Sequence, residues 1–268
     1  MGEKWAALHV RLDAMLAHAT AELKARAGSV AGQRVLDIGC GAGETCAIWL
    51  TGGADVTGVD VSAPMLAVAA ERTQGKARLL HADASTWRSE ALFDLAVSQL
   101  GLMFFANPEK AFATIATNLH PGGRLLFTCW RAESENQWVT TPMDAIRSLL
   151  PEGPPPVPHA PGPFALADSA RLRSILEHAG FADITISAFD FPVCLATDGG
   201  VDAAVRMAMQ IGPAASALTE ASQETRALAA ERLAAVLAPH HKNGRVTLGG
   251  ALWMVEAVAT GPAPIRRS

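Results

Sequence analysis

The sequence predicts an α/β fold in which a parallel β-sheet carries helices on both faces. Short apolar segments that favour strands alternate with helical patterns five times within the first 130 residues, and such alternation is typical of parallel sheets. The first of these segments ends in a glycine-rich turn at residues 39–43 and continues into a helical pattern. Glycines let a ligand lie directly on the main chain, and the following helix directs its free N–H groups toward that ligand. This turn is the predicted ligand site.

The composition is that of a globular chain with one large domain, or one domain and a sizeable insertion. Of its 268 residues, 50% are hydrophobic and 18% are charged, and the formal net charge of −4 argues against a nucleic-acid-binding surface. No apolar run reaches the ~18 residues of a membrane span. The chain opens without a secretory signal pattern, and its cysteines lack CxxC spacing. We therefore expect a cytoplasmic protein without stable membrane insertion.

The elements of the first half follow from apolar spacing and turn residues. Residues 4–27 place leucines at helical spacing and stop at Gly28. Ser62 is placed to cap the helix after the second strand, with Pro64 in its first turn. A turn at residues 120–123 (HPGG) precedes the fifth strand. Strands are predicted at residues 34–38, 54–60, 77–81, 93–98 and 124–130.

The alternation of strands and helices stops after residue 130. Residues 131–167 are expected to be irregular because they are rich in proline, including the Gly-Pro-Pro-Pro run at 153–156. A helix at 169–179 and a strand at 184–191 resume the sheet, and an alanine-rich helical segment follows. The last strand, 246–259, contains Gly249 and Gly250, which would allow a bend or a bulge near its start. Both late insertions can fold over the carboxyl edge of the sheet, where α/β sheets bind ligands.

The glycine turn and the acids around it indicate the ligand. The spacing at residues 39–43 is GxGxG, whereas dinucleotide turns have GxGxxG and phosphate loops have a lysine. Glu44, at the start of the next helix, would repel a pyrophosphate. Asp37 would favour a cationic ligand, and Asp60 is placed to accept both hydroxyls of a ribose. Asp83 can accept from an adenine amine, with a helix cap as its alternative role. Together these features describe S-adenosylmethionine.

At these positions the chain resembles the class I S-adenosylmethionine-dependent methyltransferases (type 11/25-like), in the branch of ubiquinone and menaquinone biosynthesis. The similarity is in register over roughly residues 30–130 and continues more weakly from residue 179 to the last strand. Its motifs are residues 35–43 (VLDIGCGAG), 59–66 (VDVSAPML), 82–84 (ADA) and 119–125 (LHPGGRL). The resemblance implies a Rossmann-like, doubly wound sheet of seven strands in the order 3-2-1-4-5-7-6, with an antiparallel seventh strand.

The resemblance also implies cofactor-binding residues. The glycine turn would hold the methionine portion, Asp60 the ribose, and Asp83 the adenine amine. The full set is Asp37, Gly39, Cys40, Gly41, Gly43, Asp60, Val61, Met65, Asp83, Ala84 and Ser98. Gln99 stands where similar sequences commonly carry an arginine, so a neutral amide replaces a cation at the reaction edge.

The domains expected from these patterns are a cofactor core, flanked by a helical segment and by two insertions that form a helical lid. Their bounds are 1–30 (N-terminal helical segment), 31–130 (S-adenosylmethionine-binding core), 131–167 (proline-rich lid insertion), 168–191 (return to the sheet), 192–245 (helical lid insertion) and 246–268 (last strand and tail).

Candidate acceptor-site residues are aromatic or apolar, with one amide, because such side chains line most small-molecule pockets. They are Trp5, Gln99, Met103, Trp130 and Trp138. Core packing is the alternative role of the tryptophans and of Met103. A hydroxyl acceptor would need a general base, for which the histidine candidates are His9, His81, His159, His240 and His241, each with the alternative of a surface or hydrogen-bonded position. Gln99, His9 and His159 are the candidates for a catalytic role. No His, Cys, Asp and Glu residues have metal-ligand spacing, so no metal is expected.

The predicted reaction is in-line methyl transfer from S-adenosylmethionine to a small-molecule acceptor, leaving S-adenosylhomocysteine. Because the donor methyl is already activated by positive charge, the protein would mainly supply alignment and exclusion of water. Oxygen, nitrogen, carbon and sulfur acceptors are all compatible, and the apolar residues 99–105 and 192–215 leave room for a hydrophobic, quinone-like acceptor. The alternatives are an NAD(P)-dependent oxidoreductase on a related sheet and a non-catalytic S-adenosylmethionine-binding domain.

Overall fold

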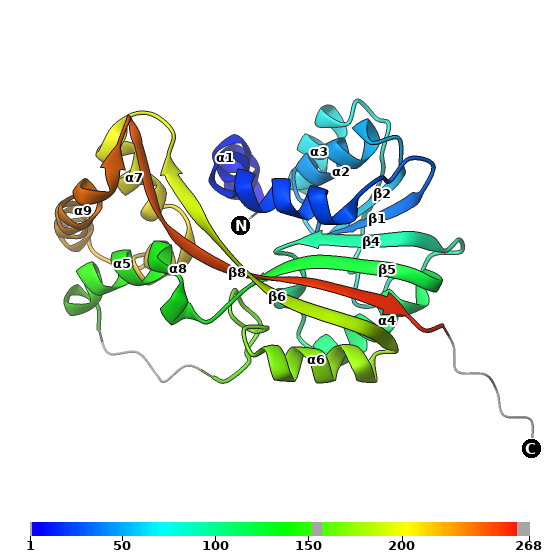
Figure 1. Cartoon of the computed structure of the whole chain (residues 1–268). Coiled ribbons are helices and arrows are strands. Elements are labelled where there is room, and N and C mark those ends of the chain that lie inside the picture. Colours follow the sequence, from blue (N-terminus) through cyan, green and yellow to red (C-terminus); the bar gives the residue numbers. More distant parts are fainter. Residues whose placement is uncertain (1, 152–156, 262–268) are drawn as a thin grey trace, which may run out of the picture.

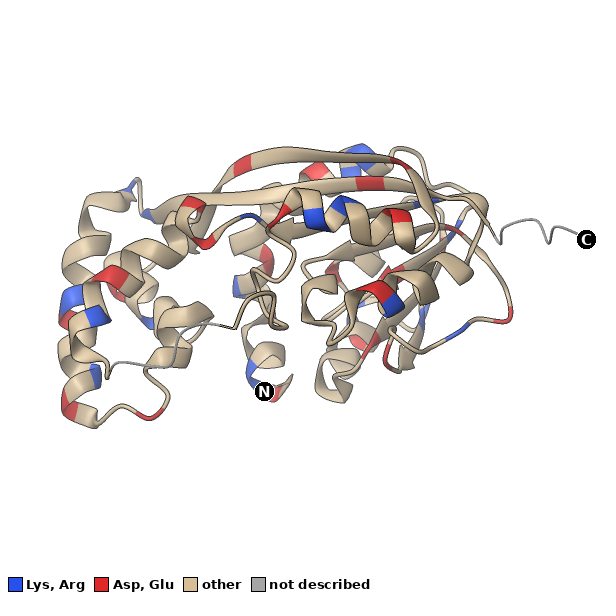
Figure 2. Ribbon diagram, turned by 90° about the horizontal axis from the view of Figure 1, so that it is seen from below, with Lys and Arg blue, Asp and Glu red and all other residues tan. Residues whose placement is uncertain are grey.

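The chain folds into a twisted sheet flanked by helices and a smaller lobe of helices beside it, as the computed structural model in Figure 1 shows. The structure describes residues 2–151 and 157–261. The proline run predicted at residues 153–156 lies outside the described residues. Figure 2 shows lysines, arginines, aspartates and glutamates interspersed over both parts of the molecule.

The order of the sheet confirms the prediction. Its main path is β3-β2-β1-β4-β5-β8-β6, in which β1 to β5 are parallel and β8 lies antiparallel between β5 and β6. The short β7 pairs with β8 and makes an eighth strand that the sequence did not predict. The strands are β1 Arg34–Ile38, β2 Asp55–Asp60, β3 Arg78–His81, β4 Phe93–Gln99, β5 Leu119–Trp130, β6 Phe181–Ala196, β7 His241–Lys242 and β8 Arg245–Ala259.

Helices cover both faces of this sheet. The helices are α1 Gly2–Ala27, α2 Glu44–Thr51, α3 Ala63–Arg72, α4 Pro108–Thr117, α5 Gln137–Ile146, α6 Ser169–His178, α7 Gly200–Ala208, α8 Gly212–Ala217 and α9 Gln223–Leu237. Short 3₁₀ turns are η1 Leu102–Phe104, η2 Glu133–Glu135, η3 Arg147–Leu149 and η4 Ala238–His240. In Figure 1, α1, α2 and α3 lie above the sheet, and α4 and α6 lie below it. The predicted cap is confirmed, because the Ser62 hydroxyl accepts from the Met65 N–H at 3.4 Å.

The helical lobe consists of α5, α7, α8, α9 and the distal halves of β6 and β8 (Figure 1). β6 and β8 have 16 and 15 residues, and their pairing runs from Phe181 opposite Ala259 to Ala196 opposite Val246. Distal residues such as Val193 and Val246 are fully buried against the lobe. One continuous ribbon of two strands therefore belongs both to the sheet and to the lobe.

The prediction that residues 131–167 are irregular is wrong at its start. α5 forms there, with Trp138, Val139, Pro142 and Ile146 buried along one helical face. Most prolines of this segment follow residue 150, so they do not oppose a helix before it. The apolar spacing of residues 138–146 was hidden by the composition of the residues that follow.

Two local predictions about strand ends also need correction. β5 begins at Leu119, and the predicted turn at residues 120–123 is a bulge within it, because Phe93 pairs with Leu119 but Leu95 pairs with Arg124. The predicted bulge at Gly249 and Gly250 is absent, since β6 and β8 pair through both positions without a register shift. Close packing explains the glycine at position 250, because a Cβ there would lie 2.4 Å from Cγ2 of Val193.

Candidate functional site

A cavity of about 1450 Å³ opens at the carboxyl ends of the parallel strands. One end, here called the glycine end, is lined by the strand termini and includes Gly39, Gly41, Val61, Met65 and Ala84, together with Asp60 and Asp83. The other, here called the aromatic end, is lined by α1, η1, β5 and the helical lobe, and includes Trp5, Met103, Phe104, Trp130, Trp138 and Ile211. Gln99, the last residue of β4, lines the same cavity.

The glycine turn brings bare backbone to the wall of the cavity. Gly39 and Gly41 line the cavity with φ values of 66° and 51°, which side chains rarely adopt. A Cβ on Gly39 would lie 3.1 Å from the Gly101 Cα, and a Cβ on Gly41 would lie 3.2 Å from the Met65 Cε. The turn thus has room for a ligand only because it carries no side chains at these positions.

Asp60 joins the glycine turn to the start of α3. Its Oδ2 accepts from the Gly41 N–H and its Oδ1 from the Ser62 N–H, both at 2.8 Å. Two backbone donors therefore fix the orientation of this carboxylate at the cavity wall. Each oxygen keeps a second lone pair with which to accept from a ligand hydroxyl.

Asp83 and Ala84 lie at the end of β3, across the glycine end from the turn. The Asp83 Oδ1 accepts from the Ser85 N–H at 2.8 Å. This contact closes a turn and does not cap a helix, which answers the alternative role considered for Asp83. Both Asp83 and Ala84 line the cavity.

Asp37 lies behind the glycine turn and does not line the cavity. It is 1% exposed, and neither of its carboxylate oxygens has a hydrogen-bond partner among the described residues. Burial raises the pKa of Asp37 to about 6; Asp60 adds to this, whereas Thr45 and Cys46 oppose it. The charge of Asp37 can thus act on a ligand only through the turn.

Three other predicted cofactor residues also point away from the cavity. Ser98 is fully buried and donates to the Ile38 carbonyl at 2.7 Å. The Cys40 thiol packs beside Gly58, where a Cβ would lie 2.9 Å from its Sγ. A Cβ on Gly43 would lie 2.8 Å from the Ala69 Cβ, so Gly43 lets α2 approach α3. These residues shape the turn from behind.

The role that the sequence suggested for Glu44 is wrong in its geometry. Its carboxylate turns toward α1 and accepts from the Thr20 hydroxyl at 3.4 Å, instead of facing the ligand cavity. Burial and the nearby Asp13 raise the pKa of Glu44 to about 7, while Arg72 and the Thr20 hydroxyl oppose the shift. The argument against a pyrophosphate therefore rests on the GxGxG spacing alone.

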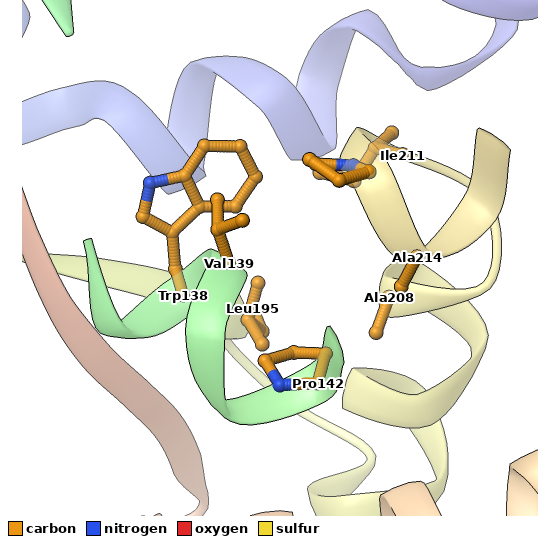
Figure 3. A pocket seen from close by; sticks show the side chains of 8 residues that line it. Trp138, Val139, Pro142, Leu195, Ala208, Ile211 and Ala214 are labelled. Carbon is orange, nitrogen blue, oxygen red and sulfur yellow. The ribbon is translucent and has the colours of Figure 1, made fainter. Parts of the chain in front are cut away.

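At the aromatic end the tryptophans are both core and cavity wall. Trp130 and Trp138 are 4% and 8% exposed, with ring centroids 4.9 Å apart. The Trp138 Nε1 donates to Asn136 Oδ1 at 3.2 Å, and its ring rests on Gly212, where a Cβ would lie 2.8 Å from Cζ3. Figure 3 shows Trp138 and Ile211 also bordering a much smaller apolar pocket of about 10 Å³ inside the helical lobe. Trp5, Gln99 and Met103 complete the predicted set that lines the main cavity.

Two histidines proposed as bases do not line the cavity. The His9 Nδ1 lies 2.7 Å from the Ala6 carbonyl oxygen on α1. His159 has a φ of 59° in the loop after residue 157 and is exposed. The histidine that does line the cavity is His81, whose Nε2 lies 2.9 Å from the Val61 carbonyl oxygen.

Several wall residues were missed by the sequence analysis. Leu12, Met15 and Leu16 of α1 line the cavity, as does Ile211 beside α8. The spacing of the α1 residues was visible in the sequence but was attributed to packing alone. The sequence analysis placed the insertion at 192–245, which contains α8, over the carboxyl edge of the sheet but did not single out Ile211.

Neither a metal site nor a membrane-spanning helix emerges from the part of the chain that the structure describes. Residues 2–151 and 157–261 contain no group of three or more His, Cys, Asp or Glu side chains that could hold a metal ion. Over the same ranges, every helix is too short or too polar to cross a bilayer.

Comparisons with known proteins match this geometry. Residues 36–127 match the methyltransferase domain family. A ubiquinone biosynthesis O-methyltransferase of Bordetella avium is 31% identical over 160 residues, which are 56% of this chain and 64% of that protein. A malonyl-[acyl-carrier protein] O-methyltransferase of Enterobacter lignolyticus is 38% identical over 102 residues, covering 38% of this chain and 40% of that protein. The chain thus spans less than two thirds of these relatives.

Solved structures show the same fold. The YcgJ protein of Bacillus subtilis superposes with a TM-score of 0.55 at 18% identity, covering 91% of this chain and 99% of that one. A Haemonchus contortus phosphoethanolamine N-methyltransferase, solved with S-adenosyl-L-methionine, gives 0.54 at 20% identity over 90% of this chain and 52% of that one. Residues 36–127 therefore form a methyltransferase domain, and the chain is similar to class I S-adenosylmethionine-dependent methyltransferases named for ubiquinone and menaquinone biosynthesis.

Proposed function

We propose that this chain transfers the methyl group of S-adenosylmethionine to a small, largely apolar acceptor. The observation that carries the proposal is the continuity of one cavity of about 1450 Å³ from the glycine end to the aromatic end. A polar nucleoside and an apolar acceptor would lie in it side by side, with Gln99 between them. Alignment of the two reactants in one enclosure is the main requirement of this reaction.

The glycine end fits the cofactor. Gly39 and Gly41 offer bare backbone for its methionine portion, and Asp60 is held ready to accept from ribose hydroxyls. Asp83 and Ala84 would bind the adenine edge, with Val61 and Met65 against its face. When bound, S-adenosylmethionine supplies an electrophilic methyl group on a positively charged sulfur. The carboxylates at this end, Asp60 and Asp83, favour a ligand that carries a positive charge.

The aromatic end fits an acceptor with an apolar body. Trp130, Trp138 and Met103 are mostly buried and contribute apolar edges to the cavity wall, which Leu12 and Met15 of α1 also line. We assign to the insertions at 131–167 and 192–245 the role of a lid that excludes water. Relatives named for ubiquinone and demethylmenaquinone support a small apolar acceptor such as a quinone precursor.

Calorimetry tests the cofactor assignment first. Wild-type protein is expected to bind S-adenosylmethionine and S-adenosylhomocysteine, and Asp60→Ala is expected to abolish detectable binding. Asp55→Ala is the matched control, because Asp55 begins the strand that Asp60 ends and its side chain is 75% exposed. Unchanged affinity in Asp60→Ala would overturn the assignment.

A turnover assay distinguishes a methyltransferase from a non-catalytic binding domain and from an oxidoreductase. Incubation with methyl-labelled S-adenosylmethionine and a mixed metabolite extract is expected to yield a labelled product that partitions into organic solvent. Cofactor binding without any labelled product would indicate a binding domain instead. If the protein binds NADH, as measured by NADH fluorescence, and does not bind S-adenosylmethionine, it is an oxidoreductase.

A further inference from the structure

Gln99 occupies the boundary between the two ends of the cavity. It is the last residue of β4 and pairs in register with Thr128 of β5. The next residue, Leu100, has a φ of 60°, and its N–H donates to the Thr128 carbonyl at 3.2 Å. A left-handed leucine is uncommon, so the chain holds a strained turn at this edge. Such strain concentrates at functional sites.

The amide of Gln99 makes no hydrogen bond to any described residue. Its Oε1 is buried without a donor, although the residue lines the cavity. Buried polar groups are satisfied in the great majority of cases, and an unpaired one destabilises the protein. An amide that is fixed at a cavity wall and lacks a protein partner is therefore suited to bind a ligand with an oxygen or nitrogen atom.

The surroundings of Gln99 define what that ligand can be. On the aromatic side lie Met103, Trp130 and Trp138, whose side chains favour a flat apolar body. The charges of the described cavity lining are mainly negative, with Asp60, Asp83 and Glu3 against Lys110. An anionic acceptor would enter a field of like charge, whereas an uncharged one would not.

We propose that Gln99 is an acceptor-binding residue that holds an oxygen atom of an uncharged, flat acceptor and discriminates against anionic acceptors. The inference rests on the proposed function, since it presumes that the glycine end takes the cofactor. Because Oε1 is buried, the amide contacts a ligand through Nε2, which can donate to a carbonyl or hydroxyl oxygen. Among the described residues, no cation lies beside Gln99 that could neutralise the carboxylate of an anionic acceptor.

Three small probes test this inference in protein saturated with S-adenosylhomocysteine. 1-Naphthol, 1-naphthoate and naphthalene share one ring system, and their binding can be followed by tryptophan fluorescence. The wild type is expected to bind 1-naphthol about tenfold more tightly than 1-naphthoate. Gln99→Leu should lower the affinity for 1-naphthol about fivefold, because one hydrogen bond is lost, and should leave the affinity for naphthalene unchanged. Gln99→Arg should reverse the preference in favour of 1-naphthoate.

Gln210→Leu is the matched control. Gln210 also has a buried Oε1 without a described partner, but it follows α7 and does not line the main cavity. This variant should bind all three probes as the wild type does.

Each contrary outcome is specific. If Gln99→Leu loses affinity equally for 1-naphthol and naphthalene, Gln99 only shapes the cavity, and the inference is overturned. A fall in S-adenosylhomocysteine affinity in the same variant would assign the amide to the cofactor and overturn it too. Both results leave the proposed function standing, whereas wild-type protein that does not bind S-adenosylhomocysteine overturns both.

Discussion

The two ends of the cavity are built in different ways. The glycine end comes from backbone and short side chains at the ends of adjacent parallel strands, all within residues 38–101. The aromatic end gathers large side chains from positions as distant as Trp5, Trp130 and Ile211. Hydrogen bonds within one turn fix the first end, whereas packing between remote elements fixes the second. A change in one end should therefore spare the other, and three variants test this separation; a fourth tests the burial of Glu44 behind the glycine turn.

The largest effect is expected from Asn136→Ala in the helical lobe. Asn136 is fully buried; its Oδ1 accepts from the Ala251 N–H and the Trp138 Nε1, and its Nδ2 donates to the Ala132 carbonyl. Removal leaves several buried groups unpaired, so the free energy of unfolding should fall by about 3 kcal/mol. Urea denaturation measures the loss.

The control for this variant is Asn243→Ala, at an exposed position in the hairpin before β8. It should lose less than half as much stability. The separation of the two ends fails if folded Asn136→Ala protein has lost S-adenosylhomocysteine affinity as completely as acceptor turnover.

Gly39→Ala acts on the glycine end alone. The new Cβ meets the Gly101 Cα at 3.1 Å in a left-handed backbone with a φ of 66°. We expect the turn to shift and S-adenosylmethionine to bind about thirtyfold more weakly, the loss of roughly two backbone contacts. Calorimetry measures this.

Gly122→Ala provides the matched control. Gly122 also has a positive φ, of 84°, but a Cβ there would meet nothing within 4 Å. Its cofactor affinity should equal that of the wild type. Similar affinities in the two alanine variants would contradict the role of the turn.

Gly212→Ala is the corresponding change at the aromatic end. Its Cβ would lie 2.8 Å from Cζ3 of Trp138 and would push the indole into the cavity. Turnover of the acceptor found in the labelled extract should fall on the order of tenfold, with cofactor affinity unchanged. Gly244→Ala, with a similar φ of 79° and an open surrounding, should keep full turnover. Reduced cofactor affinity in Gly212→Ala would show that the two ends are coupled.

The smallest effect concerns pH and Glu44, the first residue of α2, whose carboxylate accepts a hydrogen bond from α1. Because burial raises the pKa of Glu44 from 4.5 to about 7, the folded protein binds this proton more tightly than the unfolded chain. The stability contribution of Glu44 should therefore fall as the pH rises from about 5 to 7. Glu44→Gln should gain stability relative to the wild type over that interval, measured by urea denaturation at each pH.

The control for this measurement is Glu71→Gln, at an exposed position on α3. Its difference from the wild type should not change with pH. Parallel curves for Glu44→Gln and the wild type would show that the Glu44 proton is not linked to folding.

Local spacing explains what the sequence could predict. The strand order, the glycine turn and the places of Asp60 and Asp83 at strand ends all follow from residues close in the chain. The direction of single side chains did not: Ser98 and Gln99 are neighbours on β4, yet Ser98 bonds the Ile38 carbonyl while Gln99 lines the cavity. Asp37 likewise points behind the turn.

The sequence predicted which residues line the aromatic end, but not which elements of the fold bring them together. All five predicted acceptor-site residues line the cavity. Gln99, Met103 and Trp130 lie at or just after the ends of β4 and β5, whereas Trp5 and Trp138 lie on α1 and α5. The contributions of Ile211 and of α5 depend on how β6 and β8 extend, and such long-range pairing leaves no local signal. The helix α5 itself did have a local signal, the apolar spacing of residues 138–146, but the prolines after Leu150 obscured it, so the start of 131–167 was assigned the wrong local structure.

The two-stranded ribbon of β6 and β8 also restricts how the helical lobe can move. A lobe tied on by a flexible loop could swing freely, but this lobe is joined through two strands whose backbones bond to each other along their length. Rotation of the lobe must bend or twist that ribbon, so its opening is elastic and returns to one rest position. We expect the stiffness of the ribbon to limit how far the aromatic end can widen around a ligand.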